Sequence, residues 1–204
     1  MRNVRFKAEN IGIGLYRPFC KEWVYYDRLF NHRYKEPFFP TVHHNNLAIS
    51  VAGIGVSKEF SCLIVNDLPD VQLFANGQCF PLYYYEPLAH HDRTLQQAMA
   101  FMDEGAPPHS HWVRHDAITD WALQECRMRY GPSVIKEDIF YYVYGLLHSP
   151  DYRTRFAADL KKMLPRVPFV ASKEDFWAFS KAGRELAHWH LDYETVEPWC
   201  LCLT

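Results

Sequence analysis

The chain has 204 residues, of which 49% are hydrophobic and 16% aromatic, and its formal net charge is −2 at pH 7. This composition excludes intrinsic disorder, and the length fits one large domain or two small ones packed together. The charge is uneven, because residues 1–40 contain eight basic and four acidic residues, against fourteen and twenty in the remainder. The basic excess at the start is a modest indication of a polyanionic partner.

Four segments of the first half have the composition of β-strands. Residues 23–27 are rich in aromatic side chains, residues 47–52 and 61–65 are apolar and partly β-branched, and residues 79–85 form an aromatic stretch. Pro81 predicts that the last strand lies at a sheet edge or begins after the proline, because proline cannot donate a ladder hydrogen bond.

The apolar spacing after residue 117 is that of helices. Four helices are predicted: one that ends at Gly131, a second with an apolar face around Ile139, a third that begins after Ser149, and a fourth capped by Ser172. The apolar stripe of the third helix consists of Tyr152, Phe156, Leu160 and Leu164.

Strands followed by helices predict an α+β fold with a mainly antiparallel sheet. We expect one domain, made of a β-rich part (1–88), a loop-rich excursion (89–117) and a helical part (118–204). The sequence has no secretory signal and no apolar run long enough to cross a membrane. Its six scattered cysteines indicate reduced thiols, so a cytoplasmic protein without a membrane partner is expected.

One pattern resembles a magnesium-dependent nuclease site. Asp151, Asp159 and Lys161 match the layout in which two carboxylates hold the metal for phosphodiester hydrolysis. On a single helix, however, carboxylates eight residues apart are separated by roughly 12 Å along the axis, which one metal ion cannot bridge. A solvated helix face is the better interpretation of these residues.

A zinc site is also disfavoured. His188 and His190 could combine with Cys200 and Cys202, but two helical residues two positions apart point about 200° away from each other. The chain also lacks the glycine pattern of a dinucleotide site, a P-loop and a nucleophile elbow. We therefore expect a binding domain with no catalytic residues and no metal or cofactor of its own.

Six blocks in the same order, covering the chain from about Ile11 to Pro198, resemble the C-terminal target-recognition domain of type ISP restriction–modification enzymes and related helicase–methyltransferase proteins. They include LYRPFCKEWVYYDRLF (15–30), QCFPLYYYE (78–86) and ITDWALQE (118–125). The longer ones are residues 46–70, 136–169 and 176–198. The resemblance rests on the order of the blocks, since no single motif is decisive.

In that family, one polypeptide carries a nuclease, an ATP-driven helicase-like motor, an adenine-N6 methyltransferase and this specificity module. The resemblance implies that the module reads a short asymmetric sequence of double-stranded DNA and presents an adenine to the methyltransferase domain of the same polypeptide. S-adenosylmethionine, ATP and magnesium are expected only in the parent enzyme, because this chain lacks the methylation and motor motifs. The competing hypothesis is a structural docking module that packs on the methyltransferase domain and reads no bases.

DNA recognition requires Lys and Arg at phosphates and a few polar side chains at base edges. Because the block 15–30 resembles a part common to relatives that read different sequences, Trp23 and Tyr25 are expected to pack inward as scaffold. The charged rim that follows is expected to contact phosphates; it consists of Arg17, Lys21, Arg28, Asn31, His32, Arg33 and Lys35. Base readers are expected where the chain is least similar to the family: in the loop 32–45, in the turn 57–59 with Lys58, and in the excursion 90–114 with Gln96, Gln97, His109, His111 and Arg114.

Overall fold

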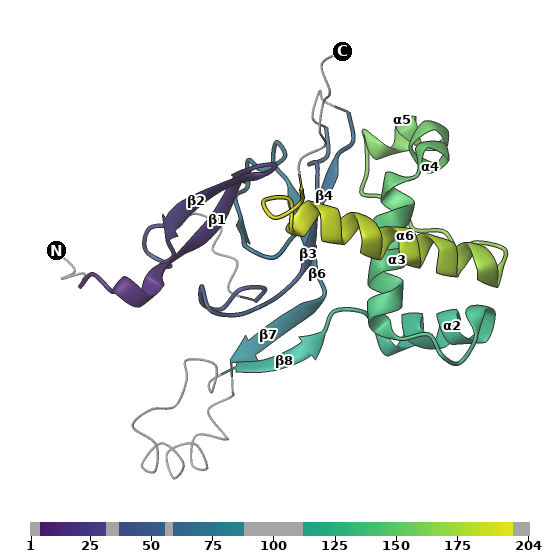
Figure 1. Cartoon of the computed structure of the whole chain (residues 1–204), viewed down its shortest axis with the longest axis horizontal. Helices are drawn as coiled ribbons and strands as arrows, with labels where there is room; N and C mark the ends of the chain where they lie inside the picture. The colour runs from purple at the N-terminus through teal and green to yellow at the C-terminus, as the bar shows by residue number, and fades with distance from the viewer. Residues whose placement is uncertain (1–4, 32–36, 56–58, 88–111, 198–204) are drawn as a thin grey trace, which may run out of the picture.

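The computed structural model describes residues 5–31, 37–55, 59–87 and 112–197 (Figure 1). Strands precede helices along the chain, which confirms the predicted α+β class. The first part contains η1 (Ala8–Asn10), β1 (Ile11–Arg17), β2 (Cys20–Tyr25), β3 (Ala48–Val51), β4 (Cys62–Val65), β5 (Leu68–Pro69), β6 (Gln78–Pro81), β7 (Tyr83–Pro87) and β8 (Trp112–Asp116). The helices are α2 (Asp120–Tyr130), α3 (Lys136–His148), α4 (Pro150–Arg155), α5 (Ala157–Leu160) and α6 (Lys173–Leu191).

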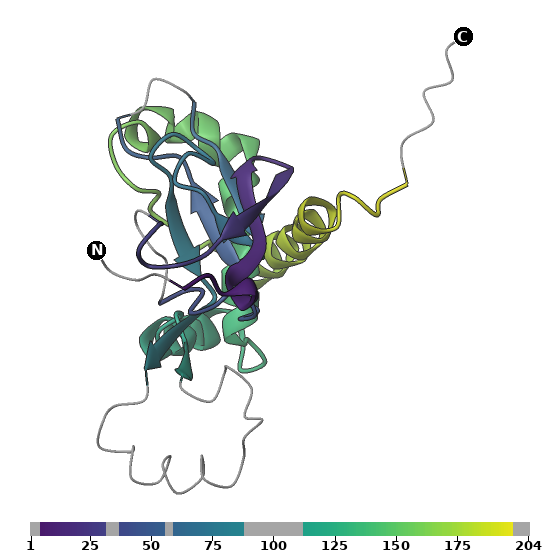
Figure 2. The same cartoon turned by 90° about the vertical axis from the view of Figure 1, so that its left-hand side faces the viewer.

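The strands form three small sheets with the orders β2-β1-β5, β4-β3-β6 and β7-β8. Every pairing is antiparallel except the short one between β1 and β5. The β7–β8 ribbon lies at the end of the molecule away from α4 and α5 in both views (Figures 1 and 2). Its second strand, β8, falls inside the stretch 89–117 that was expected to be loop-rich, so that expectation is wrong for residues 112–116.

Strands β3 and β4 of the sheet β4-β3-β6 are buried on both faces. Leu63 and Val65 of β4 belong to a cluster shared with β1, whereas Cys62 and Ile64 belong to the large cluster formed with the helices. Burial on both faces explains why the predicted strands 47–52 and 61–65 are continuous apolar runs and not alternating ones. Strand β6 lies at the sheet edge, as Pro81 predicted, and the strand ends at that proline.

Helices α3 and α6 cross in close contact at the centre of the helical part (Figure 1). Gly145 of α3 and Gly183 of α6 make the approach possible, because each lies against the backbone of the opposite helix. A Cβ atom at Gly145 would meet the carbonyl oxygen of Phe179, and one at Gly183 would meet that of Tyr141. The absence of a side chain at both positions therefore fixes how near the helices lie.

The helix ends largely follow the sequence prediction. Helix α2 stops before Gly131, whose φ of 113° lies in the range that favours glycine, and the Ser172 hydroxyl accepts a hydrogen bond from the Asp175 backbone N–H. The predicted third helix is not continuous, however. It divides at Phe156 (φ −107°, ψ 17°) into α4 and α5, and α5 ends at Leu160 instead of Leu164.

The expectation that Trp23 and Tyr25 pack inward is wrong. Trp23 is 77% exposed, and Tyr25 is only half-buried, between the rings of Phe6 and Phe30. Strand β2 is the edge of its sheet, so one neighbour strand supports it and its outer face stays open. The aromatic side chains of β2 therefore do not form a scaffold core.

Candidate nucleic-acid interface

Five of the thirteen residues predicted to contact DNA lie in the part of the chain that the structure describes. They are Arg17, Lys21, Arg28, Asn31 and Arg114. The other eight lie outside the described residues: His32, Arg33, Lys35, Lys58, Gln96, Gln97, His109 and His111. The described five come from two separate elements of the surface, the β1–β2 hairpin with its following turn and the β7–β8 ribbon.

Arg17 is held at the end of β1 in a defined orientation. Its guanidinium lies 3.9 Å from the centroid of the Tyr16 ring and donates hydrogen bonds to the carbonyl oxygens of Tyr16 (2.9 Å) and Gln72 (3.1 Å). The side chain is exposed, and no carboxylate within the described ranges forms an ion pair with it. An oriented, uncompensated guanidinium of this kind suits a phosphate contact.

Lys21, by contrast, forms ion pairs with carboxylates of the protein itself. Its ammonium donates to Glu194 (2.9 Å), lies 3.7 Å from Asp67, and is 5.5 Å from the Tyr193 ring. The hydrogen bond to Glu194 raises the pKa of Lys21, and burial raises that of Asp67. Lys21 thus ties β2 to the segment after α6, and its predicted DNA contact would have to compete with two carboxylates.

In the turn after β2, the Arg28 side chain is exposed, whereas the Asn31 side chain is hydrogen-bonded within the turn. The Asn31 side-chain oxygen accepts a hydrogen bond from the Asp27 backbone N–H (2.6 Å), while the Asp27 carboxylate accepts from Leu29 N–H (2.8 Å) and Asn10 (3.2 Å). These bonds close the turn and leave the Arg28 side chain exposed. The geometry therefore favours Arg28 over Asn31 as a group available to a ligand.

Arg114 lies on the β7–β8 ribbon with an aromatic support beneath it. Its guanidinium is 4.3 Å from the centroid of Tyr83, and Tyr83 in turn donates to Glu137 of α3 (3.1 Å). The next pair along the ribbon, Tyr84 and His115, stacks with ring centroids 5.1 Å apart. The ribbon thus carries one exposed cation and stacked rings on strands that flank residues 88–111 in the sequence.

The sequence prediction missed a group of cations on and after α4 and α5. Arg155, Lys161, Lys162 and Arg166 are all exposed, and none forms an ion pair with a described carboxylate. Other basic residues behave differently, since Lys136 lies 2.7 Å from Asp120 and 2.9 Å from Asp116. The basic excess of residues 150–167 was a usable signal, because that stretch contains five basic and two acidic residues.

The two metal patterns are not assembled in the described structure. Asp151 and Asp159 are exposed on two different short helices, not on one. His188 pairs with Asp192 (2.8 Å), whereas His190 Nδ1 lies 2.5 Å from the Tyr144 hydroxyl, and Cys200 lies outside the described residues. Within the four described ranges, no group of three or more His, Cys, Asp or Glu side chains could hold a metal ion.

A buried polar cluster joins β4 to α3 and α4. His148 Nε2 lies 3.3 Å from Cys62 Sγ, and its Nδ1 lies 3.3 Å from the Arg153 guanidinium. Because arginine can only donate, His148 accepts at Nδ1 and is neutral with its proton on Nε2, facing the sulfur. Burial raises the pKa of Cys62 to about 11, so this cysteine is a thiol and not a nucleophile.

This cluster predicts a loss of stability in mild acid. Burial, with Arg153 and His190, lowers the pKa of His148 to about 4, and burial also lowers that of His190. The unfolded chain, with histidine near pKa 6.5, then binds more protons below pH 6.5, so folding weakens as the pH falls. We expect urea titrations to show about 1–2 kcal/mol less stability at pH 5 than at pH 7. His148→Gln should reduce this difference; an unchanged difference would contradict the assignment.

Three solved structures have similar folds, and all were determined with DNA. The ATP-dependent Type ISP restriction–modification enzyme LlaBIII bound to DNA matches 98% of this chain with 33% identity and a TM-score of 0.77. A DrdV–DNA complex matches 96% with 30% identity and a TM-score of 0.80. A nuclease-deletion mutant of the Type ISP enzyme LlaGI with a DNA substrate mimic matches 96% with 30% identity and a TM-score of 0.71. The fold is thus one found within large restriction–modification enzymes.

The matched part is a small fraction of those proteins, 12% of the LlaBIII chain, 17% of the DrdV chain and 15% of the LlaGI chain. The family model described as the Type ISP C-terminal specificity domain matches residues 1–202, and the chain belongs to this family. No curated protein matches it.

In the described part of the chain, no helix is long and apolar enough to cross a membrane.

Proposed function

We propose that this chain is the DNA target-recognition domain of a larger restriction–modification enzyme. The observation that carries the proposal is its similarity, at 30–33% identity over nearly its whole length, to three proteins solved in complex with DNA. Membership of a specificity-domain family supports sequence-specific recognition over non-specific binding. The domain would work on double-stranded DNA in the cytoplasm.

The described surface supports this role through two kinds of contact. Arg17, Arg28 and Arg114, with the four cations on and after α4 and α5, supply charges that no described carboxylate neutralises and that suit phosphate oxygens. The β7–β8 ribbon supplies a two-stranded element of a size that the major groove admits. In the sequence, the predicted base readers Gln96, Gln97, His109 and His111 belong to the segment that connects the two strands of this ribbon.

The chemistry would belong to other parts of the parent polypeptide. We propose that the domain positions an adenine for N6 methylation and the DNA for cleavage, while S-adenosylmethionine, ATP and magnesium bind elsewhere in that enzyme. This chain itself would perform no catalysis. It would bind one DNA sequence preferentially: contacts to phosphates would set the orientation of the DNA, and other side chains would read base edges.

The proposal is tested by fluorescence anisotropy with the 204-residue chain and a labelled random-sequence duplex. With about four phosphate contacts, affinity should fall on the order of 100-fold between about 50 and 200 mM salt, because each contact releases counterions. No salt-sensitive binding at any accessible protein concentration would contradict the proposal. Sequence preference is then measured by competition among duplexes of different sequence. If all of them competed equally, the domain would not read bases, and the alternative of a structural docking module would be favoured.

The cations at the end of α5 provide a sharper version of this test. The double variant Lys161→Gln/Lys162→Gln should bind more weakly at every sequence and should lower the slope of log affinity against log salt by about 2. The matched control, Lys173→Gln/Lys181→Gln, removes the same charge from exposed positions of α6. Equal behaviour of the two double variants would mean that only the net charge matters and would remove Lys161 and Lys162 from the interface.

A further inference from the structure

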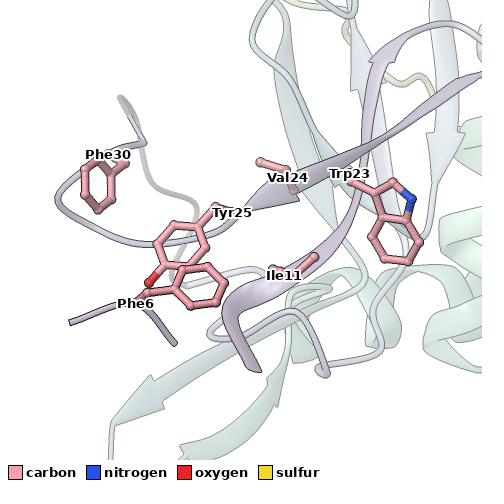
Figure 3. A pocket seen from close by; sticks show the side chains of 6 residues that line it. All are labelled: Phe6, Ile11, Trp23, Val24, Tyr25 and Phe30. Carbon is pink, nitrogen blue, oxygen red and sulfur yellow. The ribbon is translucent and has the colours of Figure 1, made fainter. Parts of the chain in front are cut away.

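An aromatic groove on the β1–β2 hairpin is exposed in the described structure. It is lined by Phe6, Ile11, Trp23, Val24, Tyr25 and Phe30 and has a volume of about 590 Å³ (Figure 3). Phe6, Trp23 and Phe30 are 67%, 77% and 62% exposed. Soluble proteins rarely leave a contiguous patch of this kind open unless another surface covers it.

The groove is built by specific contacts and is not a chance gathering of side chains. Phe6 stacks on Tyr25 with ring centroids 5.4 Å apart, and Phe30 meets the same ring edge-on at 5.8 Å. The Tyr25 hydroxyl accepts a hydrogen bond from the Lys7 backbone N–H (3.1 Å), and Tyr26 N–H donates to the Asn10 carbonyl (2.8 Å). The segment before β1, strand β2 and the following turn thus hold the rings of Phe6, Tyr25 and Phe30 in place before a partner binds.

The lining favours a protein partner over a nucleic acid. The six side chains that line the groove are all apolar or aromatic, and the one hydroxyl among them, that of Tyr25, is already paired. Burial of such rings against apolar side chains is the pattern found at the centre of protein–protein interfaces. The cations suited to phosphates on the helical part lie on and after α4 and α5, on the other side of the central sheet from β1 and β2 (Figure 1).

The length of the related enzymes indicates which partner this is. Because the matched part is 12–17% of the related chains, those proteins are several times longer than this domain, and the family is a C-terminal domain. In such an enzyme most of the polypeptide precedes the domain and therefore reaches it next to η1 and β1. Phe6, which comes from that segment, already lines the groove (Figure 3). A preceding domain is thus tethered beside the patch, at high effective concentration.

We propose that the aromatic groove is the docking surface for the domain that directly precedes this one in the parent enzyme. The inference rests on the proposed function, because it requires that such a parent exists. The preceding domain inserts one or more apolar side chains between Trp23 and the Phe6–Tyr25 pair. The six residues that line the groove include no cation, so docking there uses none of the cations on and after α4 and α5, which lie across the central sheet (Figure 1).

The test measures binding between the 204-residue chain and a separately produced polypeptide that precedes it in the parent, by isothermal titration calorimetry. Trp23→Ser/Phe30→Ser should weaken this binding at least about tenfold, since exposed aromatic anchors carry much of an interface. The matched control is Trp121→Ser, because Trp121 is 65% exposed on α2, away from the groove. Trp23→Ser alone serves as a second variant, because Trp23 is more exposed than Phe30 and is less needed for folding.

DNA binding of the same variants separates this inference from the proposed function. The groove variants should bind the random-sequence duplex with the affinity of the unmodified chain. Unchanged binding of the preceding polypeptide by both groove variants would overturn the docking proposal. If the groove variants lost only DNA affinity, the docking proposal would be overturned, and the rings would instead stack on DNA bases. If the unmodified chain self-associated and the groove variants did not, the occupant of the groove would be a second copy of this chain. Failure of the unmodified chain to bind DNA, with docking intact, would reject the recognition function and keep the docking surface.

Discussion

Gly183→Ala is expected to destabilise the chain by about 3 kcal/mol, because the new methyl group has no space at the α3–α6 crossing. The added Cβ would meet the carbonyl oxygen of Tyr141, and its other near neighbour is the Gly145 backbone nitrogen at 2.9 Å. Both are backbone atoms, so no side-chain rotation relieves the clash and the helices must separate. Alanine's better helix propensity, worth about 1 kcal/mol, offsets only part of this cost.

The measurement is urea unfolding followed by circular dichroism, with thermal unfolding as a second readout. At this chain length, about 3 kcal/mol corresponds to a fall in Tm of roughly 6–12 °C. Ala182→Ser is the matched control, since it adds one heavy atom at the neighbouring exposed position and should change stability by about 0.5 kcal/mol or less. Equal stability of Gly183→Ala and the unmodified chain would show that the helices are not in close contact in solution.

Phe176→Ala is expected to cost about 4 kcal/mol, in the range of large-to-small changes of fully buried aromatic residues. Phe176 is 0% exposed and joins three helices, because its ring stacks on Tyr130 of α2 at 4.4 Å and lies 4.9 Å from Tyr142 of α3. Alanine removes both ring contacts and leaves a cavity where α2, α3 and α6 meet. Phe176→Leu should cost less than half as much, since leucine fills most of that volume.

Trp121→Ala provides the control for this prediction. It also removes an aromatic ring from a helix, but Trp121 is 65% exposed, so its loss should change stability by about 0.5 kcal/mol or less. If Phe176→Ala and Trp121→Ala had similar unfolding free energies, the helical part would not be organised around Phe176. A retained DNA affinity in Phe176→Leu would further show that the ring acts through the fold and not through the interface.

Much of the fold was predictable because its signals are local in the sequence. The strands at 47–52 and 61–65 are apolar runs, Gly131 marks a helix end, and Ser172 lies where a capping residue is needed. Each of these depends on the conformational preference of a few neighbouring residues. The division of the third helix at Phe156 was not predictable in this way, because its apolar stripe keeps helical spacing across the break.

The candidate interface was predictable only in part, because sequence spacing does not show what a cation is paired with. Lys21 was predicted to face DNA, yet its main partner is Glu194, which lies 173 positions away in the sequence. Lys161 was interpreted as part of a solvated helix face, yet it belongs with Lys162, Arg155 and Arg166 to a group of unpaired exposed cations among the described residues. Whether a basic side chain is neutralised within the protein is decided by long-range contacts.

The amino-acid sequence by itself determined the α+β class, the central strands and the capped helices, because periodicity and turn chemistry act between near neighbours. The order of the six blocks in the sequence also indicated the family. Only the tertiary structure decided that Trp23 faces outward and that Gly145 and Gly183 meet. The physical reason is that a strand pattern shows which residues share a face, whereas exposure depends on which distant elements cover that face.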